Sequence, residues 1–319
     1  MMLAMHRILL TSLIAASALA LPAGASAADI LVVPDPAAQQ LTALDGTIVW
    51  VSGAFGHQKL MQHTPDGAVA AVKGTRESRS YRSIDLGHDS DGKLRLTYLR
   101  CDAGTPCQAL WNDLDGRRAT FRKLALPNCA VSTAPSQWRT RIAYGLQCTG
   151  SAANRRRTGL YVKNGSRPPR RLPRPRDAVR FGVDQIESVD LRGTRVAAVA
   201  ADIYEYSFSE TVAGTGIRSF LAAASEGDSD ENARGLAIQS AAAHWTLTDA
   251  EHAGDPAEAI IVRQAGDCLQ RERLVSPPDA AERFEAIDLA VDGATLYLVK
   301  PGTGIVTHAF TPDPTLTCP

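Results

Sequence analysis

A short phrase that ends in Asp-Leu occurs three times in this chain, as Ser83-Ile84-Asp85-Leu86, Ser188-Val189-Asp190-Leu191 and Ala286-Ile287-Asp288-Leu289. Each copy is followed within a few residues by a glycine-containing turn and then by an apolar segment. The aspartates of successive copies lie roughly 100 residues apart, about twice a repeat length of roughly 50 residues. A repeat of that length indicates supersecondary units that stack on one another, because one unit cannot bury its apolar surface alone.

Strand and turn signals divide the chain into six such units. Asp-Gly turns between apolar segments occur at Asp45-Gly46, Asp91-Gly92 and Asp292-Gly293, and Asp-Gly is a strong hairpin signal because glycine accepts a positive φ. A second hairpin follows in most units, so each unit is expected to hold four antiparallel strands. The last unit is one strand short, and the apolar segment Ile30–Val33 precedes the first unit. We therefore predict an all-β fold whose last sheet is completed by the N-terminal strand.

Units that bury both faces of a sheet can be arranged radially around an axis, which leaves few strand edges exposed. The segment Ser83–Leu124, with its turn at Ser90-Asp91-Gly92 and its later strands Gln108–Trp111 and Arg117–Leu124, resembles one blade of the TolB-like or WD40-like six-bladed β-propellers. The resemblance implies a six-bladed β-propeller of four-stranded antiparallel blades. It also implies a rigid binding platform more readily than a catalyst, and it points to no specific residue.

The N-terminus has the pattern of an export signal. His6 and Arg7 precede the apolar run Ile8–Leu21, which is shorter than the about 20 residues that span a bilayer, and Ala25-Ser26-Ala27 fits a cleavage site. We predict a signal peptide over residues 1–27, cleaved after Ala27, and a single β-propeller domain over residues 28–319. The mature chain is expected to be secreted or periplasmic, and its many arginines and few lysines are typical of a bacterium with a GC-rich genome.

All six cysteines follow the predicted signal peptide, and an even number in an exported chain indicates disulfides. Cys101 and Cys107 flank a Gly-centred turn, and Cys129 and Cys148 are symmetric about residues 136–141. Residues opposite each other in a hairpin lie within disulfide reach, so these pairs are predicted to bond, which leaves Cys268 with Cys318. A zinc site is the alternative, but no Cys-x-x-Cys pair and no adjacent histidine supports it.

The repeated aspartates Asp85, Asp190 and Asp288 fall at equivalent inner-strand positions of units two, four and six, where Gln239 and Ala43 align in units five and one. One interpretation is a ring of carboxylates near the central channel that holds a cation through oxygen ligands, which makes these aspartates the metal candidates of the sequence. The alternative is that each carboxylate accepts hydrogen bonds from backbone N–H groups of a neighbouring strand and fixes the spacing of the blades.

The segment from Arg155 to Arg180 is the strongest binding candidate, because it holds nine arginines and one lysine but a single acid, Asp177. Guanidinium groups match phosphate and sulfate oxygens, so an anionic cell-envelope polymer or an acidic glycan is the expected partner. The alternative is a solvated connector. Tyr204 and Tyr206 share one face of a predicted strand, where their rings can stack on sugars or pack between blades. The arginine candidates are Arg155, Arg156, Arg157, Arg167, Arg170, Arg171, Arg174 and Arg176.

The sequence contains no G-x-S-x-G, no H-E-x-x-H and no phosphate-binding glycine loop, so we name no catalytic residue and expect no cofactor. A net charge of zero gives no global attraction to nucleic acid or to acidic membranes. The first hypothesis is a secreted, monomeric, non-enzymatic binding module for a protein or an anionic polymer. The alternative is a glycan-active hydrolase or lyase with paired carboxylates at the channel mouth, and the third is a scaffold domain of a larger assembly.

Overall fold

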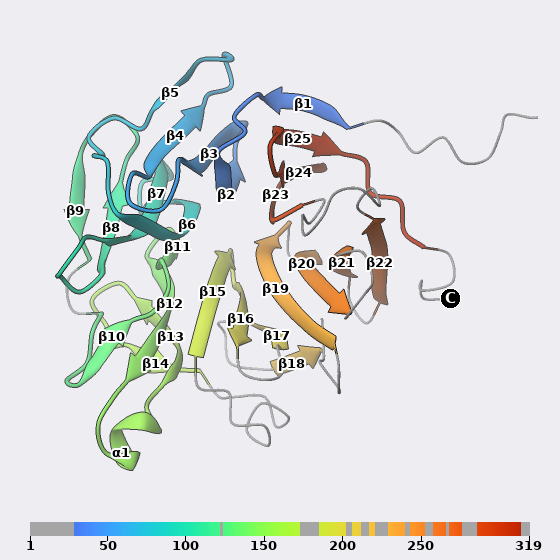
Figure 1. Cartoon of the computed structure of the whole chain (residues 1–319). Coiled ribbons are helices and arrows are strands. Elements are labelled where there is room, and N and C mark those ends of the chain that lie inside the picture. Colours follow the sequence, from blue (N-terminus) through green and yellow to red (C-terminus); the bar gives the residue numbers. More distant parts are fainter. Residues whose placement is uncertain are drawn as a thin grey trace, which may run out of the picture.

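The structure, a computed structural model, describes residues 29–121, 124–172, 185–201, 206–211, 217–220, 229–239, 243–252, 258–265, 268–275 and 286–313. These residues form a six-bladed β-propeller, as predicted (Figure 1). The first strand of a blade lies nearest the centre and the later strands follow outward, except in blade three, where the second strand is the inner one (Figure 1). Within the described ranges, no helix is long and apolar enough to cross a membrane.

The blades are numbered along the chain, and their strands are given from the inner to the outer edge. Blade one is β2 (Ala38–Leu44), β3 (Thr47–Ser52), β4 (Lys59–His63) and β5 (Val69–Ala71), and blade two is β6 (Ser80–His88), β7 (Leu94–Cys101), β8 (Gln108–Asn112) and β9 (Arg118–Thr120). Blade three is β10 (Cys129–Val131) with β11 (Ser136–Trp138), β12 (Arg141–Cys148), β13 (Gly159–Asn164) and β14 (Arg170–Arg171). Blade four is β15 (Gln185–Arg192), β16 (Arg195–Ala201), β17 (Tyr206–Thr211) and β18 (Ile217–Phe220), and blade five is β19 (Ser229–Ile238), β20 (Ala243–His252), β21 (Glu258–Ala265) and β22 (Cys268–Val275). Blade six is β23 (Asp288–Asp292), β24 (Thr295–Lys300), β25 (Gly304–His308) and β1 (Ile30–Val33).

The N-terminal strand closes the ring, as the sequence predicts. Strand β1 pairs antiparallel with β25, with Ile30 opposite Thr307 and Leu31 opposite Val306 (Figure 1). The two strands approach so closely that a Cβ on Gly304 would lie 2.1 Å from the carbonyl oxygen of Val33. The last blade is therefore built from both ends of the described chain.

A buried ion-pair cluster stands at this closure. The ring of His308, with 5% of its side chain exposed, places Nδ1 2.7 Å from Asp29 Oδ1 and Nε2 3.0 Å from Glu272 Oε2 of blade five. Lys300 Nζ lies 2.5 Å from the other oxygen of Asp29. Burial alone would lower the pKa of His308, but the hydrogen bonds to Glu272 and Asp29 raise it. Burial alone would raise the pKa of Asp29, but its bonds to Lys300 and His308 lower it.

The predicted Asp-Gly hairpins form where the sequence places them. Asp45 and Gly46 both adopt positive φ, 53° and 75°, as a two-residue turn of this type requires. Blade three lacks an Asp-Gly pair, and Arg139 takes the left-handed conformation there with φ 56°. The inner edge of blade three is also interrupted, because β10 and β11 both pair with β12. These two departures explain the poor turn signal of the third unit.

The hydrophobic core lies between adjacent blades. Val49 and Leu60 of blade one pack with Leu86, Leu96 and Tyr98 of blade two in one cluster of buried side chains. Similar clusters join blades three and four, five and six, and six and one. Every blade therefore depends on its neighbours for the burial of its faces, as expected of a ring of stacked repeats.

One disulfide lies within blade two and another lies within blade three. Cys101 bonds Cys107 at the β7–β8 turn, and Cys129 bonds Cys148 directly across the β10–β12 pair. Both are pairs that the sequence suggests. Cys268 also takes part in a disulfide, and its predicted partner Cys318 lies outside the described residues.

Candidate functional site

The repeated aspartates link neighbouring blades through the backbone. The N–H of Leu41 in blade one donates to Asp288 Oδ2 of blade six at 2.8 Å, and the N–H of Ile238 in blade five donates to Asp190 Oδ2 of blade four at 2.6 Å. All of these groups are buried. The hydrogen bonds are those expected if the carboxylates fix the spacing of the blades.

Hydroxyl groups make the same kind of link elsewhere in the ring. The N–H of Leu86 donates to Thr42 Oγ1 at 3.0 Å, and the N–H of Leu191 donates to Ser136 Oγ at 2.8 Å. The blade-one acceptor is thus Thr42 and not the aligned Ala43. Gln239 joins blade five to blade six differently, because its Nε2 donates to the carbonyl of Gly293 at 2.7 Å. The repeated phrase is therefore one version of a general inter-blade hydrogen bond.

Asp85 and Asp190 are two buried carboxyl groups whose pKa values are both raised. Both are almost completely buried, and the nearby hydroxyl of Ser136 opposes the rise of the pKa of each. Burial raises the pKa of Asp85 well above its ordinary value, and the neighbouring Asp190 raises it further. Burial also raises the pKa of Asp190, while Arg192, whose Nε lies 3.7 Å from Asp190 Oδ1, opposes the shift. Burial raises the pKa of Asp288 to about 8.

These carboxyl groups are not arranged as a metal centre. Among the residues that the structure describes, no three His, Cys, Asp or Glu side chains are grouped so that they can hold a metal ion. A glycan hydrolase, the alternative from the sequence, needs two carboxyls that reach a substrate. Asp85, Asp190 and Asp288 are each at most 9% exposed, and Asp190 and Asp288 accept backbone hydrogen bonds from neighbouring blades.

The predicted arginines of blade three gather at its outer edge. The helix α1 (Ala152–Arg155) connects β12 to β13 and lies at the periphery of the molecule (Figure 1). Pairing of β13 with β14 places Arg171 opposite Tyr161 and Arg170 opposite Val162, and the guanidinium of Arg171 lies against Gly159. The arginine edge is defined here as Arg155, Arg156, Arg157, Arg170 and Arg171.

The arginine edge is largely exposed, and its side chains have no ionic partner among the residues that the structure describes. Arg155, Arg156 and Arg170 are exposed, and Arg157 and Arg171 are half-buried. Within the part of the chain that the structure describes, no carboxylate pairs with any of the five. Arg155 donates to the carbonyl of Gly150 at 2.5 Å and Arg157 to that of Pro127 at 3.3 Å. The edge is therefore a concentration of positive charge whose side chains are partly held by the backbone.

The remaining predicted binding residues are not brought to this edge by the described structure. Arg167 is exposed at the β13–β14 turn, at the far end of β13 from α1. Arg174, Arg176 and Tyr204 lie outside the described residues, and Tyr206 begins β17, where its side chain is not described.

An exposed aromatic side chain on blade one is absent from the residues predicted from the sequence. Phe55 lies between Gly53 and Gly56 in the β3–β4 turn, is 61% exposed, and has the guanidinium carbon of Arg79 5.0 Å from its ring centroid. The only signal in the sequence is the phenylalanine itself, placed between two glycines where a turn is predicted.

Comparisons with known proteins identify the fold. No protein-family model matches the chain, and no curated protein matches it. A mutant of the Aleuria aurantia lectin in complex with α-methyl-L-fucoside is 9% identical, covers 91% of this chain and 98% of its own, and has a TM-score of 0.50. SapL1 lectin in complex with α-methyl fucoside is 12% identical, with 88% and 95% covered and a TM-score of 0.49. The β-propeller domain of the Trilobed protease from Pyrococcus furiosus is 9% identical, with 87% and 83% covered and a TM-score of 0.48. At such identities the likeness is one of fold, and the chain is similar to six-bladed β-propellers.

Proposed function

We propose that this protein is a secreted, non-enzymatic binding module that holds an anionic polysaccharide of the cell envelope along the arginine edge of blade three. The observation that carries the proposal is the concentration of five arginines on one blade edge without an ionic partner among the described residues. The whole chain has a net charge of zero, so this edge is a local feature and not a consequence of overall composition.

The chemistry of arginine suits this ligand. Each guanidinium carries five N–H donors in a planar fork that matches the oxygens of carboxylate, phosphate and sulfate groups. The bonds from Arg155 to Gly150 and from Arg157 to Pro127 use one donor each and limit the motion of both side chains. Side chains that are already positioned lose less entropy when a ligand binds. The exposed side chains of Arg155, Arg156 and Arg170 keep donors available to a polymer.

The scaffold is compatible with this role. The Aleuria aurantia lectin, which has the same fold, is solved in complex with α-methyl-L-fucoside. Two disulfides in the described chain fit an exported protein. These points support a binding module, while the arginine edge supports the anionic character of its ligand.

Affinity chromatography on immobilised heparin, used as a sulfated polysaccharide probe, tests the proposal. The variant Arg155→Gln/Arg156→Gln/Arg170→Gln is compared with the matched control Arg82→Gln/Arg118→Gln/Arg139→Gln, which also removes three exposed arginines. Wild type and control are expected to elute at similar salt concentrations, and the edge variant at a clearly lower one, because exposed ion pairs are screened by salt. Equal loss in both variants would mean that binding depends on total charge, and failure of wild type to bind in low salt would refute the proposal.

A further inference from the structure

The turn that carries Phe55 is part of a small exposed cluster on blade one. Phe55 is one of four exposed large hydrophobic residues among those described, and the other three lie on strands: Ile30 and Leu31 on β1, and Val69 on β5. A single exposed apolar side chain is ordinary on a protein surface, and Phe55 stands out because a guanidinium group lies over its ring. We call Phe55, His57, Lys59, Glu77 and Arg79 the Phe55 cluster.

The cluster is assembled by a short antiparallel contact outside the regular strands. Gln58 pairs with Ser78 through two backbone hydrogen bonds of 2.9 and 3.0 Å. Since side chains alternate across an extended backbone, burial of Gln58 and Ser78 turns their neighbours outward. His57, Lys59, Glu77 and Arg79 are the exposed neighbours. Arg79 lies over the ring of Phe55, while His57 and Lys59 pair with Glu77.

The backbone beneath the cluster is firmly held. The N–H of Gly56 donates to the carbonyl of Arg79 at 2.7 Å, and the N–H of Gly53 donates to that of Ala37 at 3.1 Å. Gly53 has φ 101°, and a Cβ there would lie 2.7 Å from the carbonyl oxygen of His57, so the turn needs glycine at this position. The backbone that carries Phe55 is therefore held in place by hydrogen bonds and close packing.

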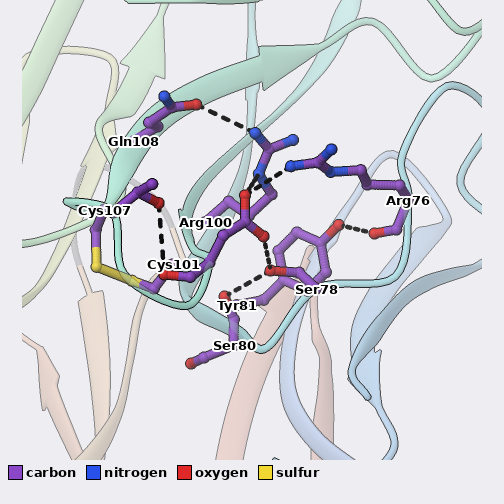
Figure 2. Close-up of polar contacts among 10 residues, drawn as sticks. Arg76, Ser78, Ser80, Tyr81, Arg100, Cys101, Cys107 and Gln108 are labelled. Atoms are coloured by element: carbon purple, nitrogen blue, oxygen red, sulfur yellow. Dashed lines mark hydrogen bonds and ion pairs between the residues drawn. A yellow bond between two sulfur atoms is a disulfide. The ribbon is translucent and has the colours of Figure 1, made fainter. Parts of the chain in front are cut away.

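The second segment of the cluster is anchored to blade two. Figure 2 shows Arg76, Ser78 and Tyr81 in a polar network beside the Cys101–Cys107 disulfide. Arg76 and the hydroxyl of Ser78 bond the two oxygens of Asp102 at 2.7 and 3.0 Å, and the hydroxyl of Tyr81 donates to the carbonyl of Arg76. The side chains of Arg76 and Ser78 are thus engaged in this network. Glu77 and Arg79 alternate with them along the extended backbone, so they point to the other side.

The charges of the cluster are unequal. Glu77 lies 2.6 Å from His57 Nδ1 and 3.4 Å from Lys59 Nζ, so its carboxylate already has two partners. Arg79 pairs with no carboxylate among the described residues, and its guanidinium lies over the ring of Phe55. The cluster therefore offers a largely exposed aromatic ring, one cation without a carboxylate partner among the described residues, and several hydrogen-bonding groups.

We propose that the Phe55 cluster is a binding site for a hexuronic acid unit, with the apolar face of the sugar ring against Phe55 and the sugar carboxylate at Arg79. The C–H groups of a pyranose pack on an aromatic ring by dispersion and burial of apolar surface. The guanidinium binds the carboxylate through charge-assisted hydrogen bonds. In this arrangement His57 and Glu77 of the same cluster exchange hydrogen bonds with hydroxyl groups of the sugar. The site is on blade one and does not depend on the arginine edge of blade three.

Saturation-transfer NMR and calorimetry with uronate tetramers test this site. The probes are tetramers of galacturonate, mannuronate and guluronate, together with the methyl ester of each as an uncharged match. Wild type is expected to bind at least one acid at least about tenfold more tightly than its ester, a difference of about 1.4 kcal/mol. Phe55→Ala should lose about tenfold for acid and ester alike. Arg79→Gln should reduce affinity for the acid to that for the ester.

Matched control variants show whether binding is specific to the Phe55 cluster. Val69→Ala removes another exposed apolar side chain of blade one, and Arg118→Gln removes another exposed arginine; both should bind as wild type does. Binding to none of the acids, equal affinity for acid and ester, or unchanged binding by Phe55→Ala would each overturn the inference. The arginine-edge variant should keep tetramer binding, so failure of the heparin experiment and failure of this one are distinguishable.

Discussion

Replacement of His308 by Leu is expected to weaken the closure of the ring. The imidazole bridges Asp29, next to the N-terminal strand, and Glu272 of blade five, with N···O distances of 2.7 and 3.0 Å. Its side chain is only 5% exposed, so water cannot readily replace it. Leucine fills a similar volume but leaves both carboxylates without that partner. The perturbation therefore tests the electrostatic part of the closure while keeping most of the packing.

The expected loss is about 3 kcal/mol. Removal of one partner from a buried charge cluster costs about 3–5 kcal/mol. The lower end applies here, because Asp29 keeps Lys300 at 2.5 Å and Glu272 keeps the N–H of Thr311 at 2.9 Å. For a domain of this size, 1 kcal/mol shifts Tm by about 2 °C, so Tm should fall by about 6 °C.

The loss should also depend on pH, with a definite sign. The folded pKa of His308 is raised, so its contribution is complete below the unfolded value of about 6.5 and disappears as pH rises through the folded value. The folded pKa of Asp29 is lowered, so its contribution is present above about 3.9 and is lost as pH falls through the folded value. The cluster should stabilise the fold most between these limits.

Thermal unfolding of wild type and His308→Leu at pH 5.5 and pH 9 measures both effects. The matched control is His57→Leu, whose ion pair with Glu77 is exposed to solvent and is therefore expected to contribute little to stability. The Tm deficit of His308→Leu should be largest at pH 5.5 and smaller at pH 9. A deficit that equals the control, or one that is the same at both pH values, would refute the electrostatic reasoning.

Three other sets of substitutions test the ring and its staples, each by urea unfolding. Asp288→Ala leaves the buried N–H of Leu41 without its acceptor and should cost about 2 kcal/mol of stability. The control Asp292→Ala frees only the exposed N–H of Gly46 and should cost less than about 0.5 kcal/mol. Equal costs would show that burial of the hydrogen bond is unimportant. Gly87→Ala places a Cβ 1.7 Å from the carbonyl oxygen of Gln137, so β6 and β11 must separate. The expected loss of stability is at least about 3 kcal/mol. A variant as stable as wild type would mean that the two strands are not in close contact. The Cys129→Ser/Cys148→Ser variant opens a disulfide with a sequence separation of 19 and should lose about 3 kcal/mol of stability. The Cys101→Ser/Cys107→Ser variant opens one with a separation of 6 and should lose about 2 kcal/mol, because loop-closure entropy grows with loop length. The reverse order would contradict the entropic account.

The fold could be predicted from sequence because its signals are local. Asp45-Gly46 adopts the two positive φ values of a tight hairpin, and the orphan segment Ile30–Val33 pairs with β25 as expected. Blade three was hardest to predict, since Arg139 occupies a left-handed position that a glycine usually marks. Tertiary contacts hold it there: the N–H of Arg139 donates to the carbonyl of His88 at 2.6 Å. No local pattern in the sequence of blade three reports this contact with blade two.

The two candidate sites also differ in how well the sequence predicts them. The arginines from Arg155 to Arg171 are visible as a run in the sequence, and the helix-and-strand connection brings most of them to one edge. The Phe55 cluster is invisible in sequence, because Glu77 and Arg79 reach Phe55 only through the pairing of Gln58 with Ser78. That pairing lies outside the regular strands, so no alternating strand pattern in the sequence predicts it.

The geometry of the ring also explains why the most repeated residues are poor candidates for a binding site. Closure requires each inner strand to satisfy its backbone against the next blade, and Asp288, Asp190, Ser136 and Thr42 supply acceptors for that purpose. A buried N–H without an acceptor is costly, so these side chains are committed to the fold. The outer edges and turns carry no such requirement, because their backbone is reached by water. Side chains there, such as Arg156 and Phe55, are available for recognition without loss of closure, which is why both proposed sites lie at the periphery.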